Sequence, residues 1–397
     1  MAVKTFTNFT LFDGTGDKNE NDAWFSVDTE SGKLVDRGTG TAPKSEKTVD
    51  LNGEYVMPGF VNVHTHITVD PDDLGGGLGH DLSESEAAVF GFENLQKLLK
   101  SGVTYIRECG TAFDVDIKLK KLQKVGRLPK TPHMMASGQA YSMTGGHGDG
   151  AHMAYLVDSP DEMRKAVRQG LKNGSEAIKM MATGGVMTPG DFMDDPQLSV
   201  EEMRTGVEEA HHKGVIVAAH AEGNPGIQNA LDAGVDSIEH GFYLTEKEAE
   251  QAIKQGTYVT PTLIAEWAIP AFGKGLLPDW EVKKAEDALD DTYENFKRAF
   301  KQGVKFTCGT DAGTPLNGFD KTPDEFELLT KIGMTTAEAY HCSTKNSVAL
   351  CGIQDEYGTL EVGKFADFQV LKKDPLADVK NVKQEDKQVF LGGERQF

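Results

Sequence analysis

At residues 56–66 the chain reads Val-Met-Pro-Gly-Phe-Val-Asn-Val-His-Thr-His. Before this stretch, short apolar runs alternate with clusters of Gly, Asn and Asp, a pattern typical of a small antiparallel sheet. After it, short apolar segments alternate with helical stretches such as 83–101, where Ser83 and Glu86 have capping-box spacing and Gly102 is placed to end the helix. The stretch therefore predicts the start of a domain built from βα repeats.

Eight candidate strands follow Pro58, and most of them come directly after a glycine that would end the preceding helix. The predicted strands are 59–64, 103–108, 133–137, 177–181, 215–220, 237–240, 258–262 and 305–310. Eight such units over roughly 250 residues match a (β/α)8 barrel. We therefore predict an α/β fold, with a (β/α)8 TIM barrel over 58–352.

Both ends of the chain lie outside this repeat and alternate like strands. The C-terminal alternation covers 358–371 and 388–394, and the N-terminal alternation covers 3–57. Neither end is long enough to bury a core alone, so the two ends should pair with each other. The sequence predicts a small β-sandwich domain formed from both termini, 1–57 and 353–397.

Composition excludes several functions. With 41 Lys and Arg against 62 Asp and Glu, the net charge of −21 would repel nucleic acid and anionic lipid. No apolar run reaches the roughly 18 residues of a membrane span. The four cysteines form no Cys-x-x-Cys pair, and the N-terminus lacks the apolar stretch of a secretory signal. We expect a cytoplasmic protein with reduced thiols and no nucleic-acid or membrane partner.

Metal-compatible side chains stand where the predicted strands end. His64 and His66 are two residues apart in an extended segment, so their side chains leave on the same side. His220, His240 and Asp311 end three further strands, and in a barrel the strand ends share one active rim. A lone histidine there is more often structural than a ligand. Five such groups on one rim are hard to explain by packing, so we predict a divalent metal site.

Lys179 lies inside the apolar strand at 177–181, where an ammonium would face a steep desolvation cost. A buried lysine amine is reactive, and addition of CO2 would make it an anionic carbamate that can bridge two metal ions. The alternative is that Lys179 points out of the barrel into a salt bridge.

These residues together resemble the amidohydrolase superfamily. The resemblance rests on 56–66, Lys179, His220, His240 and the run Gly-Thr-Asp-Ala-Gly at 309–313. Within it, the runs at 145–148, 178–185 and 219–222 resemble the metal-dependent Xaa-Pro dipeptidase and Xaa-Arg carboxypeptidase group, which is related to imidazolonepropionase. The family joins a barrel to a small β-sandwich made from both termini, and its members are commonly homo-oligomers, so we expect both features here.

The resemblance also implies a ligand set. His64, His66 and Asp311 would hold one zinc, His220 and His240 a second, and carboxylated Lys179 would bridge the two together with a hydroxide. Two such ions acidify bound water and polarise a scissile carbonyl. Asp311 would act as the base that passes a proton to the leaving amine.

Two further residues are expected to contact the substrate. His147, in a Gly-rich loop, would bind the substrate carbonyl or the oxyanion; the alternative is a flexible loop histidine. Glu222, two residues after His220, departs from the tyrosine expected of Xaa-Pro cleavage and resembles imidazolonepropionase. An acidic residue there favours a basic or polar side chain or an ammonium terminus on the substrate, unless it forms a structural salt bridge.

The sequence thus predicts a metal-dependent hydrolase that cleaves the amide bond of a small-molecule substrate, a dipeptide or an N-acyl amino acid. One alternative is a cyclic amide hydrolase similar to imidazolonepropionase, or a deaminase; Lys179 tells against it and Glu222 tells for it. A second alternative, an inactive scaffold, is disfavoured because every expected metal ligand is present.

Overall fold

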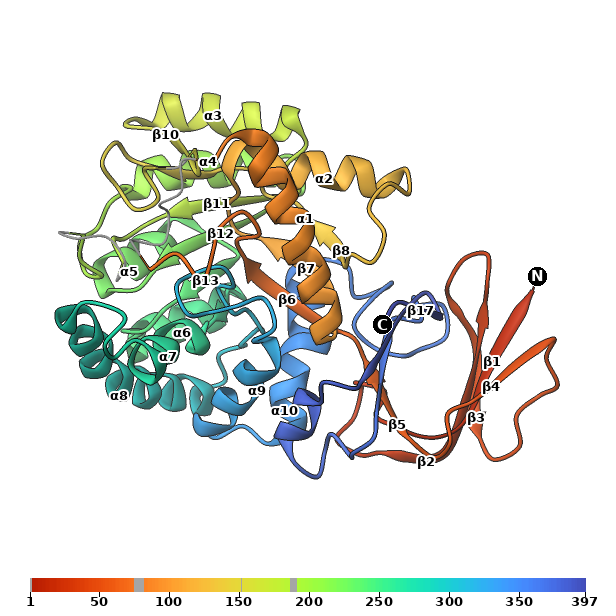
Figure 1. The fold of residues 1–397 in the computed structure, drawn as a ribbon. Helices are drawn as coiled ribbons and strands as arrows, with labels where there is room; N and C mark the ends of the chain where they lie inside the picture. The colour runs from red at the N-terminus through yellow and green to blue at the C-terminus, as the bar shows by residue number, and fades with distance from the viewer. Residues whose placement is uncertain (1, 75–81, 151, 186–190) are drawn as a thin grey trace.

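The computed structural model describes residues 2–74, 82–150, 152–185 and 191–397. The described residues form a large barrel with a smaller sheet domain at its side, and both chain termini lie in that sheet domain (Figure 1). The α/β barrel and the terminal domain predicted from the sequence are therefore both confirmed.

The terminal domain is one eight-stranded sheet in the order β17-β16-β15-β5-β1-β2-β3, with β4 paired to β1. Its strands are β1 Val3–Leu11, β2 Glu20–Asp28, β3 Leu34–Thr39, β4 Lys47–Asp50, β5 Tyr55–Pro58, β15 Phe368–Leu371, β16 Gln388–Leu391 and β17 Glu394–Arg395. The expected purely antiparallel pairing is wrong, because β1 runs parallel to β4 and β5. Alternating polarity marks the strands but does not carry their direction.

Four phenylalanines from both ends of the chain build the core of this domain. Phe25 on β2 lies 5.1 Å from Phe368 on β15, measured between ring centroids, although β1 and β5 separate the two strands in the sheet. Phe6 also lies 5.1 Å from Phe368, and Phe390 stacks on it at 4.4 Å. The sheet therefore folds over on itself, as a sandwich does, around a core that neither terminus completes alone.

The barrel has seven regular parallel strands and one irregular segment. The strands are β6 Phe60–Thr65, β7 Val103–Glu108, β8 His133–Met135, β11 Ala177–Met181, β12 Ile216–Ala221, β13 Ser237–His240 and β14 Tyr258–Thr260. The predicted eighth strand, 305–310, makes a single bridge from Phe306 to Val259, so that prediction is wrong as stated. Its backbone still reaches both neighbours and closes the barrel, but Cys308 N donates to Ser347 Oγ at 3.1 Å instead of to a strand.

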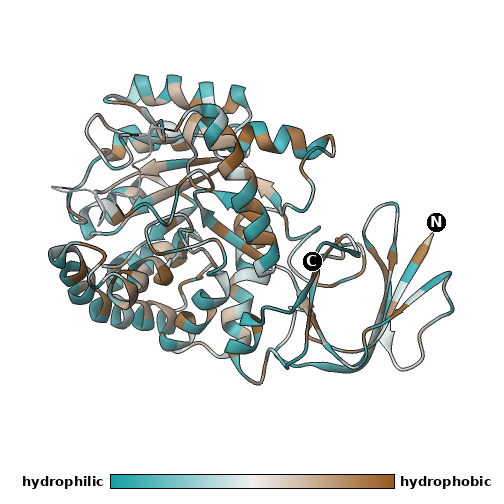
Figure 2. Ribbon diagram, viewed as in Figure 1, coloured by the Kyte–Doolittle hydropathy of each residue, from teal (hydrophilic) through white to brown (hydrophobic). Residues whose placement is uncertain are grey.

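Helices surround the strands (Figure 1). They are α1 Glu84–Ser101, α2 Val115–Lys124, α3 Pro160–Asn173, α4 Val200–His211, α5 Asn224–Ala233, α6 Glu246–Gln255, α7 Leu263–Phe272, α8 Asp279–Gln302, α9 Thr322–Lys331, α10 Thr336–His341 and α11 Val348–Leu350. The capping box of Ser83 and Glu86 and the left-handed Gly102 bound α1 as predicted. In Figure 2 hydrophobic residues follow the barrel strands, while the outer helices mix both kinds.

The short strands β9 Ala140–Ser142 and β10 Ala154–Leu156 follow β8 and extend the sheet beside β11. All four cysteines are buried free thiols, as expected from their spacing. Within the described residues, no helix combines the length and apolar character that crossing a bilayer would require.

The shared core predicts that the terminal domain loses stability when its central ring is removed. Phe368→Ala should lower the free energy of unfolding by about 3–5 kcal/mol, because the cavity it leaves cannot be refilled from either terminus. Urea denaturation followed by tryptophan fluorescence would measure this, since Trp24 is buried in the same sheet. Val362→Ala, at a position 57% exposed, is the matched control and should change stability little. Equal stability of the two variants would contradict the shared core.

Candidate metal centre and active site

The barrel brings the predicted site residues to one end. His64 and His66 come from the end of β6, Lys179 from β11, His220 from β12, His240 from β13, and Asp311 from the segment after 305–310. All of these except His64 line one cavity, together with His147 and Glu222. His64 lies just behind the cavity wall and is fully buried.

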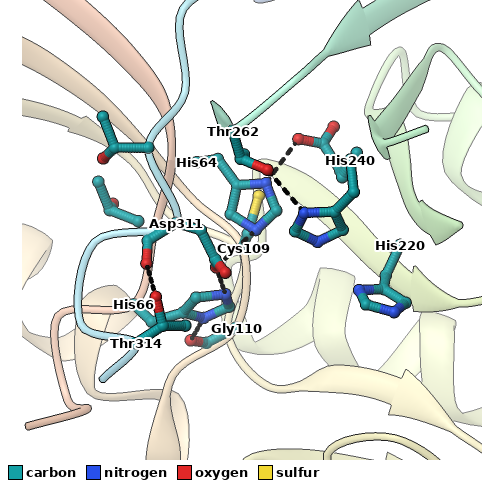
Figure 3. A network of polar contacts seen from close by, with 12 residues as sticks. His64, His66, Cys109, Gly110, His220, His240, Thr262, Asp311 and Thr314 are labelled. Atoms are coloured by element: carbon teal, nitrogen blue, oxygen red, sulfur yellow. Dashed lines mark hydrogen bonds and ion pairs between the residues drawn. The ribbon is translucent and has the colours of Figure 1, made fainter. Parts of the chain in front are cut away.

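The first group of potential ligands is His64, His66 and Asp311 (Figure 3). Asp311 Oδ1 lies 3.2 Å from His64 Nε2 and 3.1 Å from His66 Nε2. Burial alone would raise the pKa of Asp311, but the charges and hydrogen bonds of the two histidines hold that pKa well below its usual range. Asp311 is therefore an anion at neutral pH.

The outer nitrogens of both histidines are occupied, which fixes where their lone pairs point. His66 Nδ1 donates to Gly110 O at 2.9 Å, and His64 Nδ1 donates to Glu239 Oε2 at 2.8 Å. Burial lowers the pKa of His66, which favours the neutral ring. In a neutral ring Nε2 then carries the lone pair. Two imidazole lone pairs and a carboxylate converge on one point, an arrangement that suits a divalent cation.

The second group contains His220, His240 and Glu222, each with one possible ligand atom within 4.8 Å of the others. The ring centroids of the two histidines are 4.6 Å apart. His220 Nε2 donates to Gly184 O at 3.0 Å, which leaves Nδ1 with the lone pair. His240 Nδ1 bonds Thr262 Oγ1 at 2.7 Å, which leaves Nε2 free (Figure 3). Burial lowers the pKa of both rings well below the usual value, so both are neutral and able to bind a metal.

Lys179 stands between the two groups. Its side chain is 1% exposed, and Nζ lies 3.2 Å from His64 Nε2. The ion pairs among the described residues include none to Lys179, so the alternative of an outward salt bridge is wrong. An ammonium in this position faces histidines without a counter-ion. A carbamate would reverse that charge and supply an anionic ligand to both groups.

Two of these residues have strained backbones. His240 has φ of 68° and Asp311 has φ of 58°, a left-handed region that costs a non-glycine residue of order 1 kcal/mol or more. Such strain persists where the surrounding structure enforces it, and it is common at functional sites.

A buried ion pair supports His64, and the sequence analysis missed it. Arg107 Nη2 donates to Glu239 Oε1 at 2.7 Å, and Arg107 Nε donates to Val63 O at 2.6 Å. Burial would raise the pKa of Glu239, but Arg107 and His64 hold it far below the usual range. Glu239 therefore stays an acceptor for His64 Nδ1. The available signal was a charged residue inside each of two buried strands, Arg107 in β7 and Glu239 in β13.

Cys109 lies beside His64 and Glu239 but is a poor ligand. Burial raises the pKa of its thiol to about 12, and its Sγ donates to Val63 O at 3.5 Å. The thiol is therefore protonated at neutral pH.

His147 is held firmly beside the second group, so the alternative of a flexible loop histidine is wrong. Its Nδ1 lies 3.1 Å from Asp191 Oδ2, and its backbone N donates to Gln197 Oε1 at 2.8 Å. The ring stacks on His220 at 4.2 Å between centroids. Because Nδ1 faces Asp191, Nε2 is the atom available to a substrate.

Glu222 is buried, at 4% exposure, and its Oε2 has no hydrogen-bond partner among the described residues. Its one ion-pair contact is Oε1 to His220 Nε2 at 3.9 Å, so the alternative of a structural salt bridge with a lysine or arginine is not seen in the described chain. Burial raises the pKa of Glu222 well above its usual value. Glu222 contacts the nitrogen of His220 that donates to Gly184, and one of its carboxylate oxygens lies within 4.8 Å of a ring nitrogen of both His220 and His240.

Comparison with known proteins places this geometry in a family. The model of the amidohydrolase family matches residues 55–395, and the chain belongs to that family. It is a metal-dependent amidohydrolase, a hydrolase that acts on C–N bonds.

Particular relatives refine the comparison. The ochratoxinase of Aspergillus niger is 32% identical over 358 residues, which cover 82% of this chain and 72% of that protein. An imidazolonepropionase of Rhizobium rhizogenes is 24% identical, covering 86% of this chain and 84% of that protein. These relatives agree with the resemblance found in the sequence.

Two solved structures are also similar. A Xaa-Pro dipeptidase with methionine bound in its active site has a TM-score of 0.89 and 28% identity, covering 99% of both chains. A prolidase complexed with N-methylphosphonate-L-proline has a TM-score of 0.89 and 26% identity, also covering 99% of both chains.

The support of His64 by Glu239 predicts an effect on metal binding. Glu239→Gln should weaken zinc affinity about 10–100-fold, because His64 loses the anionic acceptor that orients its ring. Chelator competition would measure the affinity. Since this variant also leaves Arg107 charged and unpaired, the double variant Arg107→Met with Glu239→Leu is the second test. It should recover folding stability while zinc stays weakly bound. Unchanged affinity in the double variant would contradict the orienting role.

Proposed function

We propose that the protein uses two divalent metal ions, zinc in our assignment, to hydrolyse the amide bond of a dipeptide or an N-acyl amino acid. One observation carries the proposal. Two imidazole lone pairs converge with Asp311, two further imidazole lone pairs belong to rings that line the same cavity, and buried Lys179 lies in its wall. The ligands would be His64, His66 and Asp311 for one ion, His220 and His240 for the other, and carboxylated Lys179 for both.

Each residue of the site would then have a separate role in the reaction. Two ions held there would acidify a bound water and polarise the scissile carbonyl. Asp311 is an anion at the cavity wall and would take a proton and pass it to the leaving amine. His147 presents Nε2 toward the cavity and would hydrogen-bond the carbonyl oxygen as negative charge develops on it.

The substrate class is supported by what similar structures hold. One of the two similar structures holds methionine and the other a phosphonate derivative of proline, so each holds an amino acid or a compound built on one. The cavity here is lined by apolar side chains as well as by the ligands, among them Met181, Phe242 and Ile269. Such a lining would accept an apolar side chain next to the polar reacting groups.

A second candidate is a cyclic amide hydrolase like imidazolonepropionase. The run His-Ala-Glu at 220–222 and the buried Glu222 favour it, and imidazolonepropionases are among the relatives. Metal content decides between the two. Two ions per chain with a carbamate on Lys179 support the dipeptide or N-acyl amino acid hydrolase, and one ion with a free amine supports the cyclic amide hydrolase. The proposal also includes a cytoplasmic location and a homo-oligomeric assembly.

Removal of the bridging side chain should empty the site. In Lys179→Ala we expect both bound metal and hydrolysis to be lost, because the two groups of ligands lose their shared anion. Metal content by mass spectrometry and turnover with a panel of dipeptides and N-acyl amino acids would measure this. Lys254→Ala, an exposed position on α6, is the control. Partial rescue by short-chain carboxylates would support the carbamate, whereas full activity of Lys179→Ala would refute it.

Asp311 should matter for turnover more than for retention of metal. Asp311→Asn keeps the shape and an oxygen ligand but removes the base, so kcat should fall by about a thousandfold or more while at least one zinc stays bound. Steady-state kinetics with parallel metal analysis would show this. Asp320→Asn, at an exposed position nearby, should behave like the unmodified protein. A kcat within tenfold of the unmodified value would rule out Asp311 as the base.

A further inference from the structure

A second buried carboxylate accompanies Glu222 in the cavity wall. Glu266, on α7, is 2% exposed and lines the same cavity, and its Oε1 has no hydrogen-bond partner among the described residues. Glu222 Oε2 likewise has no hydrogen-bond partner among the described residues. Buried carboxylate oxygens without partners are costly, and they are usually satisfied by something that the protein binds.

Among the described residues, no lysine or arginine forms an ion pair with either carboxylate. Burial raises the pKa of Glu266 to about 8, and the charge of Glu266 adds to the effect of burial in raising the pKa of Glu222. The negative charges of Asp311 and Asp191 also raise the pKa of Glu222. The positive charge of Lys284 lowers the pKa of both carboxyl groups. Its ammonium, however, lies over the Phe192 ring, 5.6 Å from the centroid, and no ion pair joins it to either carboxylate among the described residues.

We propose that Glu222 and Glu266 together bind the α-ammonium group of the substrate, so that the enzyme acts on unblocked dipeptides in preference to N-acyl amino acids. This inference rests on the proposed amide hydrolysis and names its substrate class. The resulting charge-assisted hydrogen bonds would satisfy the two orphaned oxygens.

The reach of the pair favours an α-ammonium over a basic side chain. Glu222 Oε1 is 3.9 Å from the His220 ring, whose other nitrogen faces the proposed metal position. In a dipeptide the α-nitrogen is about 2.5 Å from the scissile carbonyl carbon, because only the N–Cα and Cα–C bonds separate them. One carboxylate oxygen of Glu222 lies within 4.8 Å of a ring nitrogen of both His220 and His240, so a carbonyl held beside these two rings brings the α-ammonium within reach of Glu222. A lysine or arginine side chain would carry its charge several bonds further away.

Glu266 completes the recognition from the helix that follows β14. It is the one charged residue in the α7 run Leu-Ile-Ala-Glu-Trp-Ala-Ile-Pro-Ala-Phe. Its neighbours Ala265 and Ile269 also line the cavity. An apolar wall that holds a single carboxylate can contact the side chain of the N-terminal residue while the carboxylate contacts its ammonium.

The test compares substrates that differ only in that ammonium. Alanyl-methionine carries it, and propionyl-methionine lacks it with otherwise the same shape. We expect kcat/KM for alanyl-methionine to exceed that for propionyl-methionine by about 100-fold or more, because a site built for a polar group rejects the analogue that lacks it. Comparable values for the two substrates would overturn the inference and leave the proposed hydrolysis standing. Failure to cleave either substrate, or any member of the wider panel, would overturn both.

Variants assign the selectivity to the pair. Glu266→Gln should lower kcat/KM for alanyl-methionine at least tenfold and leave propionyl-methionine nearly unchanged, so the ratio between them shrinks. Glu294→Gln, which removes the same charge at an exposed position on α8, should leave the ratio as it is. Metal content and thermal stability, measured in parallel, should match the unmodified protein. A Glu266→Gln variant that loses activity equally on both substrates would overturn the inference.

A last comparison tests whether Glu222 and Glu266 bind a side-chain ammonium instead of the α-ammonium. Propionyl-lysine and propionyl-norleucine differ only in a side-chain ammonium, and we expect them to be cleaved equally slowly. A strong preference for propionyl-lysine that Glu266→Gln abolishes would mean that the pair binds a basic side chain, which would overturn the assignment to the α-ammonium.

Discussion

The active end of the barrel depends on a balance of buried charge. Lys179, Asp311 and four histidines are held almost out of contact with water, where an uncompensated charge would cost several kcal/mol. Burial favours the neutral rings of His66, His220 and His240, while Asp311, hydrogen-bonded by His64 and His66, stays an anion. Among the described residues no ion pair joins Lys179 to a carboxylate, and conversion to a carbamate next to two cations would resolve that imbalance.

The rest of the barrel fixes the direction of each ligand. The outer nitrogens of His64, His66 and His220 are bonded to Glu239, Gly110 O and Gly184 O respectively, so the lone pairs point inward. The Arg107–Glu239 pair beneath His64 is fully buried, so it contributes orientation and charge more than net stability. This explains why a fully buried strand such as β7 carries an arginine.

The sequence was sufficient for features that repeat or lie close together in the chain. Glycine stops, the His-x-His pair and strand-end histidines follow local rules, so the barrel and the group of ligand candidates could be predicted. It was insufficient where spatial neighbours are distant in sequence, as with Arg107 and Glu239, or Glu222 and Glu266. The prediction of a regular strand at 305–310 failed for a related reason. Ser347, distant in sequence, accepts the hydrogen bond from Cys308 N that a neighbouring strand would have accepted.

Specificity must then lie in residues that the shared fold does not fix. A Xaa-Pro dipeptidase and an ochratoxinase both superpose on this chain over almost its whole length. These proteins thus share the barrel and the ends of its strands, and they can differ in the loops and at the starts of the helices. Here those positions hold His147 with Asp191, and Glu222 with Glu266. Glu222 lies beside the second group of possible ligands, and Glu266 lies on α7 in the wall of the same cavity. A positively charged part of the substrate that reaches both carboxylates would satisfy both.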